Sequence, residues 1–120
     1  MLMDDFYTVH ELQPSEFSLS CILVFNAHHP VFQGHFPGQP VVPGVCMVQI
    51  IKELLEQQLD EKLFLVNAPQ IKFLRLITPD ISPLVSMEWE KPDSVYRLKA
   101  GFKKDADLFK FSGDFQEENK

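Results

Sequence analysis

The chain has 120 residues, of which 45% are hydrophobic and 12% aromatic, and its formal net charge is −6 at pH 7. This length and apolar content predict one domain, residues 1–120, with a packed core. The acidic balance argues against nucleic acid as a partner, since phosphate contacts need a basic face. No apolar run approaches the ~20 residues of a membrane-spanning helix, so we expect no membrane insertion.

Two strands are predicted at residues 7–12 and 17–26, before a long loop. In the second strand, alternate apolar residues fall on one side, as in a strand with one buried face. These residues are Phe17, Leu19, Cys21, Leu23 and Phe25. The early acidic residues Asp4 and Asp5 are followed by no apolar stretch typical of a secretory signal. We therefore predict a cytoplasmic protein in which the two cysteines stay reduced.

Residues 27–44 form a loop that holds three of the four histidines, four prolines and three glycines. Loops of this length without regular structure are usually functional or disordered. This one contains too many apolar residues to be disordered, and we expect it to pack down and hold His35 in place. His28 and His29 have no metal-binding partners at a suitable spacing, so no metal site is predicted.

One helix is predicted from Gly44 to about Asp60, with Pro43 at its first position. Its apolar residues recur at helical spacing and are Met47, Ile50, Ile51, Leu54 and Leu55. Its opposite stripe is polar and contains Gln49, Lys52, Glu53 and Glu56. The sequence leaves open whether Glu53 faces solvent or a site, whereas Gln49, nearer the helix start, is predicted to line a site.

The start of this helix is a candidate anion site. We expect free N–H groups near Gly44, Val45 and Cys46, where the helix dipole favours negative charge. Such groups stabilise an oxygen that gains negative charge during a reaction. The same position favours a thiolate at Cys46, although burial as a small apolar residue is the expected state.

Four further strands are predicted after the helix, at residues 63–74, 84–90, 95–103 and 108–115. Pro69 falls inside the first of them, which indicates an edge position or a bulge. One helix against five or six strands predicts an α+β domain. Because the helix has a wide apolar surface, the antiparallel sheet is expected to curl around it.

The stretch HFPGQPVVPGV, residues 35–45, resembles the signature of the 3-hydroxyacyl-[acyl-carrier-protein] dehydratases. The matching residues are His35, Phe36, Pro37, Gly38, Pro40, Pro43, Gly44 and Val45. The segment IKFLRLITPDISPLVSMEWE, residues 71–90, resembles the part of that family that follows the helix. The resemblance implies the hotdog fold, with a curled sheet around one long central helix. It also implies a homodimer or higher even oligomer, with a substrate tunnel at the subunit interface.

The resemblance also implies roles for particular residues. His35 would be the catalytic base, and the N–H of Gly44 would hold the thioester carbonyl. Phe36, Pro43 and Val45 would lie beside the bound substrate. No cofactor is implied.

The family's second catalytic group is a Glu or Asp on the helix, and Gln49 occupies that position here. Glutamine cannot titrate, but it can donate a hydrogen bond or hold a water. Two routes are open: His35 carries out both proton transfers, or Glu53, one turn further along, replaces the acid. One helical turn is roughly 5 Å along the axis, which could put Glu53 too far away.

The leading hypothesis is dehydration of a 3-hydroxyacyl thioester to the trans-2-enoyl thioester, slowed by the missing acid. The acyl chain would be carried on the 4′-phosphopantetheine arm of an acyl carrier protein. Lys72 and Arg75 are candidates for contact with that carrier, with ordinary surface charge as the alternative. The competing hypotheses are a non-catalytic hotdog subunit that binds acyl chains or carrier protein, and an acyl thioesterase.

Overall fold

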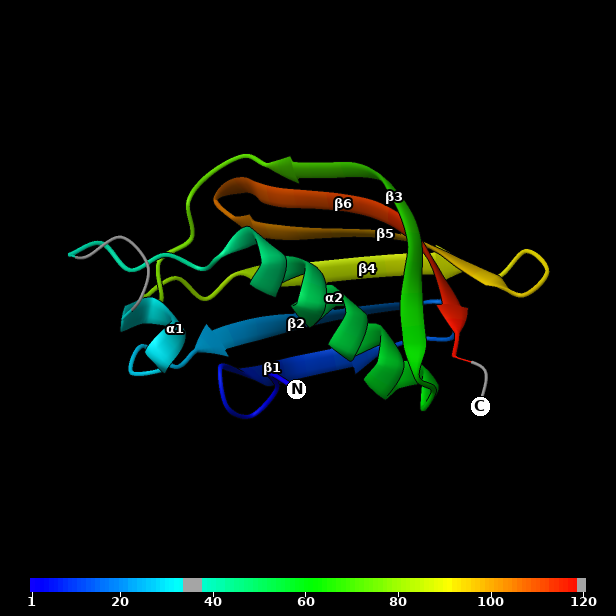
Figure 1. The fold of residues 1–120 in the computed structure, drawn as a ribbon, viewed down its shortest axis with the longest axis horizontal. Coiled ribbons are helices and arrows are strands. Elements are labelled where there is room, and N and C mark those ends of the chain that lie inside the picture. Colours follow the sequence, from blue (N-terminus) through cyan, green and yellow to red (C-terminus); the bar gives the residue numbers. More distant parts are fainter. Residues whose placement is uncertain (34–37, 119–120) are drawn as a thin grey trace.

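The computed structural model describes residues 1–33 and 38–118, and within them six strands form one antiparallel sheet (Figure 1). The elements in chain order are β1 (Tyr7–Pro14), β2 (Ser18–Phe25), α1 (Pro30–Gln33), α2 (Gly44–Leu59), β3 (Leu63–Phe73), β4 (Leu84–Glu90), β5 (Val95–Lys104) and β6 (Ala106–Glu117). The order in the sheet is β1-β2-β4-β5-β6-β3. Because β2 and β3 lie far apart in this order, the connection that contains α2 has to cross the face of the sheet.

The sheet curls around α2, as the α+β hotdog prediction required (Figure 1). Every residue predicted for the apolar stripe of the helix is buried, and Cys46 and Glu53 are buried as well. The strands supply the facing surface by alternation: in β4, Val85, Met87 and Trp89 are buried while their neighbours are exposed. Within the described part of the chain, no helix has the length and apolarity needed to cross a membrane.

The predicted alternation of β2 is confirmed for four of its residues. Leu19, Cys21, Leu23 and Phe25 are buried, whereas Phe17 lies before the strand begins and is 52% exposed. The loop prediction for residues 27–44 missed α1, a single helical turn. Four residues are too few to show a helical repeat, so no periodic signal predicts this helix. α1 is fixed by Phe32, which is buried and stacks on Phe6 with ring centroids 5.0 Å apart.

β3 is an edge strand whose pairing with β6 is interrupted on both sides of Asn67. The second interruption lies between Asn67 and Gln70 and contains Pro69, so the sequence prediction of an edge or a bulge is confirmed in both respects. β3 and the residues just after it carry large exposed apolar side chains: Phe64, Leu65, Val66, Ile71, Phe73, Leu74 and Leu76. Apolar groups along an unpaired edge are typical of an interaction surface.

Candidate functional site

The loop that carries the signature leads directly into α2. His35 and Phe36 lie outside the described residues, and the structure resumes at Gly38, whose φ of 87° needs a glycine. Val41 and Val42 are buried, and the N–H of Val42 donates to the carbonyl of Ile77 at 2.7 Å. The end of the signature loop is therefore fastened to the segment between β3 and β4.

At the start of α2, two N–H groups lack a hydrogen-bond acceptor among the described residues, whereas three were predicted. Pro43 is the residue before the first helical position, one earlier than predicted, and its carbonyl accepts from Cys46 and Met47 at 3.0 and 3.2 Å. The prediction of a free N–H at Cys46 is therefore wrong. The N–H groups of Gly44 and Val45 have no acceptor among the described residues, and no side chain caps the helix. An anionic oxygen fits these two donors.

Gly44 lies against the aromatic ring of Phe73. A Cβ atom at position 44 would come within 2.7 Å of Cζ of that ring, so the contact requires a glycine unless the ring moves. Phe73 is 54% exposed and stacks on the buried Phe109, with centroids 5.3 Å apart. A side chain of β3 thus lies against Gly44, and a substrate role for Gly44 stays a prediction.

The polar stripe of α2 contains a buried hydrogen-bond network centred on Glu53. This side chain is only 2% exposed, so the solvent-facing alternative is wrong for it. Its Oε1 accepts from the N–H of Met3 at 2.8 Å and from the hydroxyl of Tyr7 at 3.1 Å. Its Oε2 accepts from the N–H of Leu2 at 2.8 Å and from Nε2 of Gln49 at 2.9 Å. The two residues singled out on this stripe are therefore in direct contact.

The network also sets the protonation of its neighbours. Burial, together with the adjacent Glu53 charge, raises the pKa of the Tyr7 hydroxyl, which stays protonated and donates. The same two causes, burial first, raise the pKa of the Cys46 thiol. Burial raises the pKa of Cys21 to about 11. Both thiols are free and buried, so Cys46 is the small apolar residue expected and not a thiolate.

Sequence reasoning missed Tyr7, Leu2 and Met3 as partners of the helix. Two of these three donors are main-chain N–H groups, which carry no residue-specific signal in a sequence. One signal for the contact is Tyr7 itself, because the hydroxyl of a buried tyrosine needs a hydrogen-bond partner. Only the fold, which brings residues 2–7 against α2, shows that this partner is Glu53.

One hollow is lined by the signature loop, and a second hollow adjoins it. One, with a volume of about 520 Å³, is formed mainly between residues 38–41 and 76–80. The other, of about 860 Å³, shares Leu76 and Asp80 with the first and is also lined by Arg75 and Lys104. Arg75 therefore lies in the hollow that adjoins the loop. Lys72 lies on β3, opposite Lys110 of β6 in the register of the two strands.

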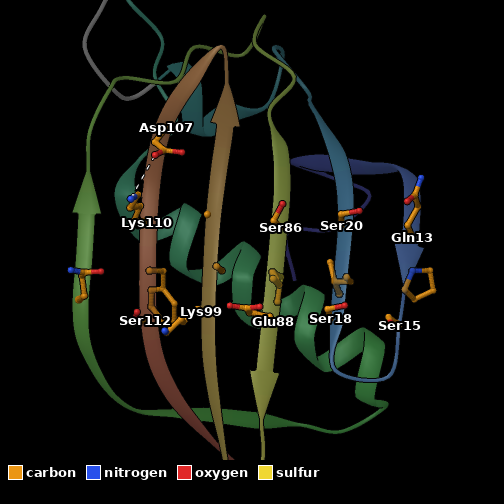
Figure 2. A pocket seen from close by; sticks show the side chains of 17 residues that line it. Gln13, Ser15, Ser18, Ser20, Ser86, Glu88, Lys99, Asp107, Lys110 and Ser112 are labelled. Carbon is orange, nitrogen blue, oxygen red and sulfur yellow. Dashed lines mark ion pairs between the residues drawn. The ribbon is translucent and has the colours of Figure 1, made fainter.

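The largest described hollow, about 880 Å³, lies on the opposite face of the sheet from α2 (Figure 2). Its lining is rich in serine and lysine and includes Ser18, Ser20, Ser86, Ser112, Lys99 and Lys110. Figure 2 shows the strands between these side chains and the helix. None of the predicted site residues that the structure describes lines it, so its size does not make it the site. Within residues 1–33 and 38–118, no group of three or more His, Cys, Asp or Glu side chains is placed to hold a metal ion.

Comparisons with known proteins agree with the geometry. A family model described as "ApeI-like: ApeI dehydratase" matches residues 11–114. The chain is 33% identical over 86 residues to the 3-hydroxyacyl-[acyl-carrier-protein] dehydratase FabZ of Syntrophomonas wolfei, an alignment that covers 66% of this chain and 59% of that protein. It is 35% identical over 78 residues to FabZ of Levilactobacillus brevis, covering 59% of this chain and 52% of that protein. The chain thus spans little more than half the length of these relatives.

A solved structure extends the likeness over most of the fold. The dehydratase heterocomplex ApeI:P from Xenorhabdus doucetiae contains a chain that superposes with a TM-score of 0.74. The match covers 88% of this chain and 92% of that chain, at 19% sequence identity. At this identity, the likeness shows the hotdog fold and nothing finer.

Replacing Glu53 tests the energetic weight of the network. Glu53→Ala leaves the donors of Leu2, Met3 and Tyr7 without their acceptor, and it should lower the free energy of unfolding by about 3 kcal/mol. Glu56→Ala is the control, because the Glu56 carboxylate accepts only the N–H of Leu63 among the described residues. Urea denaturation followed by circular dichroism measures both. An equal loss for the two variants would contradict the importance given to Glu53.

Proposed function

The chain belongs to the ApeI-like family of dehydratases, and from that premise we propose that it converts a 3-hydroxyacyl thioester to the trans-2-enoyl thioester. The observation that carries the proposal is the start of α2. There the signature loop ends at two N–H groups that have no acceptor among the described residues, on Gly44 and Val45. Gln49 follows on the same helix, in the position where the family has its acid.

The proposed reaction begins at C2 of the acyl chain. His35 removes a C2 proton, a task suited to a group whose ordinary pKa lies near neutral pH. The electron pair moves toward the thioester carbonyl, whose oxygen gains negative charge. The N–H of Gly44 and the positive end of the helix dipole stabilise that charge. Phe36, Pro43 and Val45 are proposed to flank the acyl group in this position.

The second step releases the C3 hydroxyl as water. The hydroxyl needs a proton, and we favour the imidazolium of His35 as its source, with Gln49 orienting the hydroxyl. The alternative source, Glu53, is disfavoured because its carboxylate is nearly inaccessible and already accepts four hydrogen bonds. A catalyst without a second acid should be slower by about a hundredfold to ten-thousandfold.

The proposed substrate is carried on the 4′-phosphopantetheine arm of an acyl carrier protein. Arg75 supports this proposal because it lines, with Lys104, a hollow that shares Leu76 and Asp80 with the one formed by the signature loop. Lys72 is the second candidate contact and is exposed on β3. Carrier proteins of this class would be steered by such cations. A cytoplasmic location stays a prediction from the sequence.

We further propose that the chain pairs with a second copy through β3. Ile71 and Phe73 pair with the buried residues Phe111 and Phe109 of β6, yet they are 39% and 54% exposed themselves. Strand β3 also has one edge without a neighbouring strand in the sheet. A second copy added along this edge would cover the apolar side chains and enclose the start of α2.

Loss of the imidazole tests the proposed reaction. His35→Ala should lower dehydration of a 3-hydroxyacyl-pantetheine thioester at least a hundredfold, on the order expected for loss of a general base. Formation of the enoyl thioester is measured by chromatography and mass spectrometry. His28→Ala is the control, because His28 is exposed in the same loop, and it should retain activity.

Equal turnover by His35→Ala and the parent protein would refute the proposed role of His35. If the parent yields no enoyl product but binds acylated carrier, the chain acts as a non-catalytic hotdog subunit, which the amide at Gln49 would then explain. Release of free thiol without an unsaturated product would identify a thioesterase.

A charge on the exposed edge tests the dimer. Ile71→Lys should convert the dimer to a monomer, because a dimer through β3 would bury the ammonium group without a partner. Size-exclusion chromatography with light scattering gives the mass. Leu84→Lys, on the 43% exposed Leu84 of β4, is the control and should remain a dimer. A mass unchanged in Ile71→Lys would exclude β3 as the interface.

A further inference from the structure

We infer that Glu53 is a positioning residue, which orients the amide of Gln49 and fastens the N-terminal segment, residues 2–6, across α2. The inference rests on the proposed function for the meaning of Gln49 and deepens it. It assigns to Glu53 a task other than proton donation. The argument starts from which hydrogen bonds a carboxylate can make.

An ionised carboxylate only accepts hydrogen bonds, so Gln49 has to present its NH₂ group to Glu53. The contact is 2.9 Å long and joins residues one helical turn apart. The amide of Gln49 therefore cannot rotate to present its oxygen to Glu53. Its Oε1 and its second N–H are directed elsewhere, and the oxygen is an acceptor suited to a hydroxyl group. For a 3-hydroxyacyl substrate, Gln49 would accept a hydrogen bond from the C3 hydroxyl.

The N-terminal segment explains why the charge lies at position 53. Each carboxylate oxygen of Glu53 serves two donors, and each pair includes one main-chain N–H of the segment, from Leu2 or Met3. A glutamine at position 53 has a single acceptor oxygen, so one of the two pairs would face an NH₂ group. The acid and the amide therefore cannot exchange places without releasing part of the segment. This accounts for an amide at position 49 and a carboxylate at position 53.

The surroundings of Glu53 are consistent with a fixed anion. In residues 1–33 and 38–118, no Lys, Arg or His side chain forms an ion pair with it. Its charge is stabilised by donors alone, which makes it dependent on the complete set. The segment is also held independently by Phe6, which is fully buried and contacts Phe25 and Phe32. The hydrogen bonds to Leu2 and Met3 then fix the part of the segment that lies nearest to Gln49.

The first test needs no enzymatic activity. In the parent protein, NMR hydrogen exchange should show one slowly exchanging proton on the side-chain NH₂ of Gln49 and protected amides at Leu2 and Met3. Glu53→Gln should accelerate exchange at least tenfold at one or more of these sites, because the single amide oxygen that remains serves only one of the two donor pairs. Glu56→Gln is the matched control and should change none of them, because the single donor at Glu56 suits an amide oxygen equally well. Unchanged exchange in Glu53→Gln would overturn the inference.

A double variant that swaps residues 49 and 53 separates the two parts of the inference, which are the orientation of Gln49 and the fastening of residues 2–6. Gln49→Glu combined with Glu53→Gln swaps the two side chains, and the hydrogen bond between positions 49 and 53 should form again with its direction reversed. At least one of the amides of Leu2 and Met3 should nevertheless lose protection, because the single oxygen at position 53 serves only one of the two donor pairs. Full protection of both amides in this double variant would show that the segment does not depend on a carboxylate at position 53.

The second test uses the proposed reaction. Glu53→Gln should lower kcat for dehydration by about ten- to hundredfold, on the order expected for a misplaced site group. The limbs of the pH–rate profile should stay where they are, because both proton transfers are proposed for His35. Loss of one limb would identify Glu53 as the acid and overturn the inference. If the parent shows no dehydration, the proposed function fails, and the exchange measurements alone decide the role of Glu53.

Discussion

The packing of α2 against the curled sheet is the constraint on which the rest of the structure depends. The apolar face of the helix is buried by alternate residues of the strands, which fixes the position and rotation of the helix. Once the helix is fixed, its start lies at the end of the signature loop, and its polar stripe turns toward residues 2–7. The candidate site is therefore a consequence of how one helix is buried.

The contact between Gln49 and Glu53 connects this packing to the chemistry. The position for which the resemblance implies an acid has an amide here, and a carboxylate lies one turn further along. The structure gives the acid four donors and almost no exposure. A buried charge of this kind is costly unless all of its acceptor sites are used. The network thus satisfies the buried carboxylate, and it also directs the NH₂ group of Gln49 toward Glu53.

The sequence predicted the fold well, because its main signals are periodic. Alternation in β2 and the helical repeat of α2 gave the elements, and Pro69 gave the edge and bulge of β3. It predicted less about the site. The burial of Glu53 depends on main-chain donors brought from residues 2 and 3, which no spacing along α2 reveals. The contact of Phe73 with Gly44 likewise depends on the path of β3. The role of His35 stays a prediction, because this residue lies outside the described part of the chain.

The central claim is that one acyl group meets the start of α2, the imidazole of residue 35 and the amide of residue 49 together. The most direct measurement is a crystal structure with a 3-hydroxyacyl-pantetheine in which an amide replaces the thioester. The account predicts the carbonyl oxygen within roughly 3 Å of the Gly44 N–H. It also predicts the C3 hydroxyl against Gln49 and the His35 ring facing C2. A ligand bound in the hollow on the outer face of the sheet, or a His35 ring turned away from C2, would contradict it.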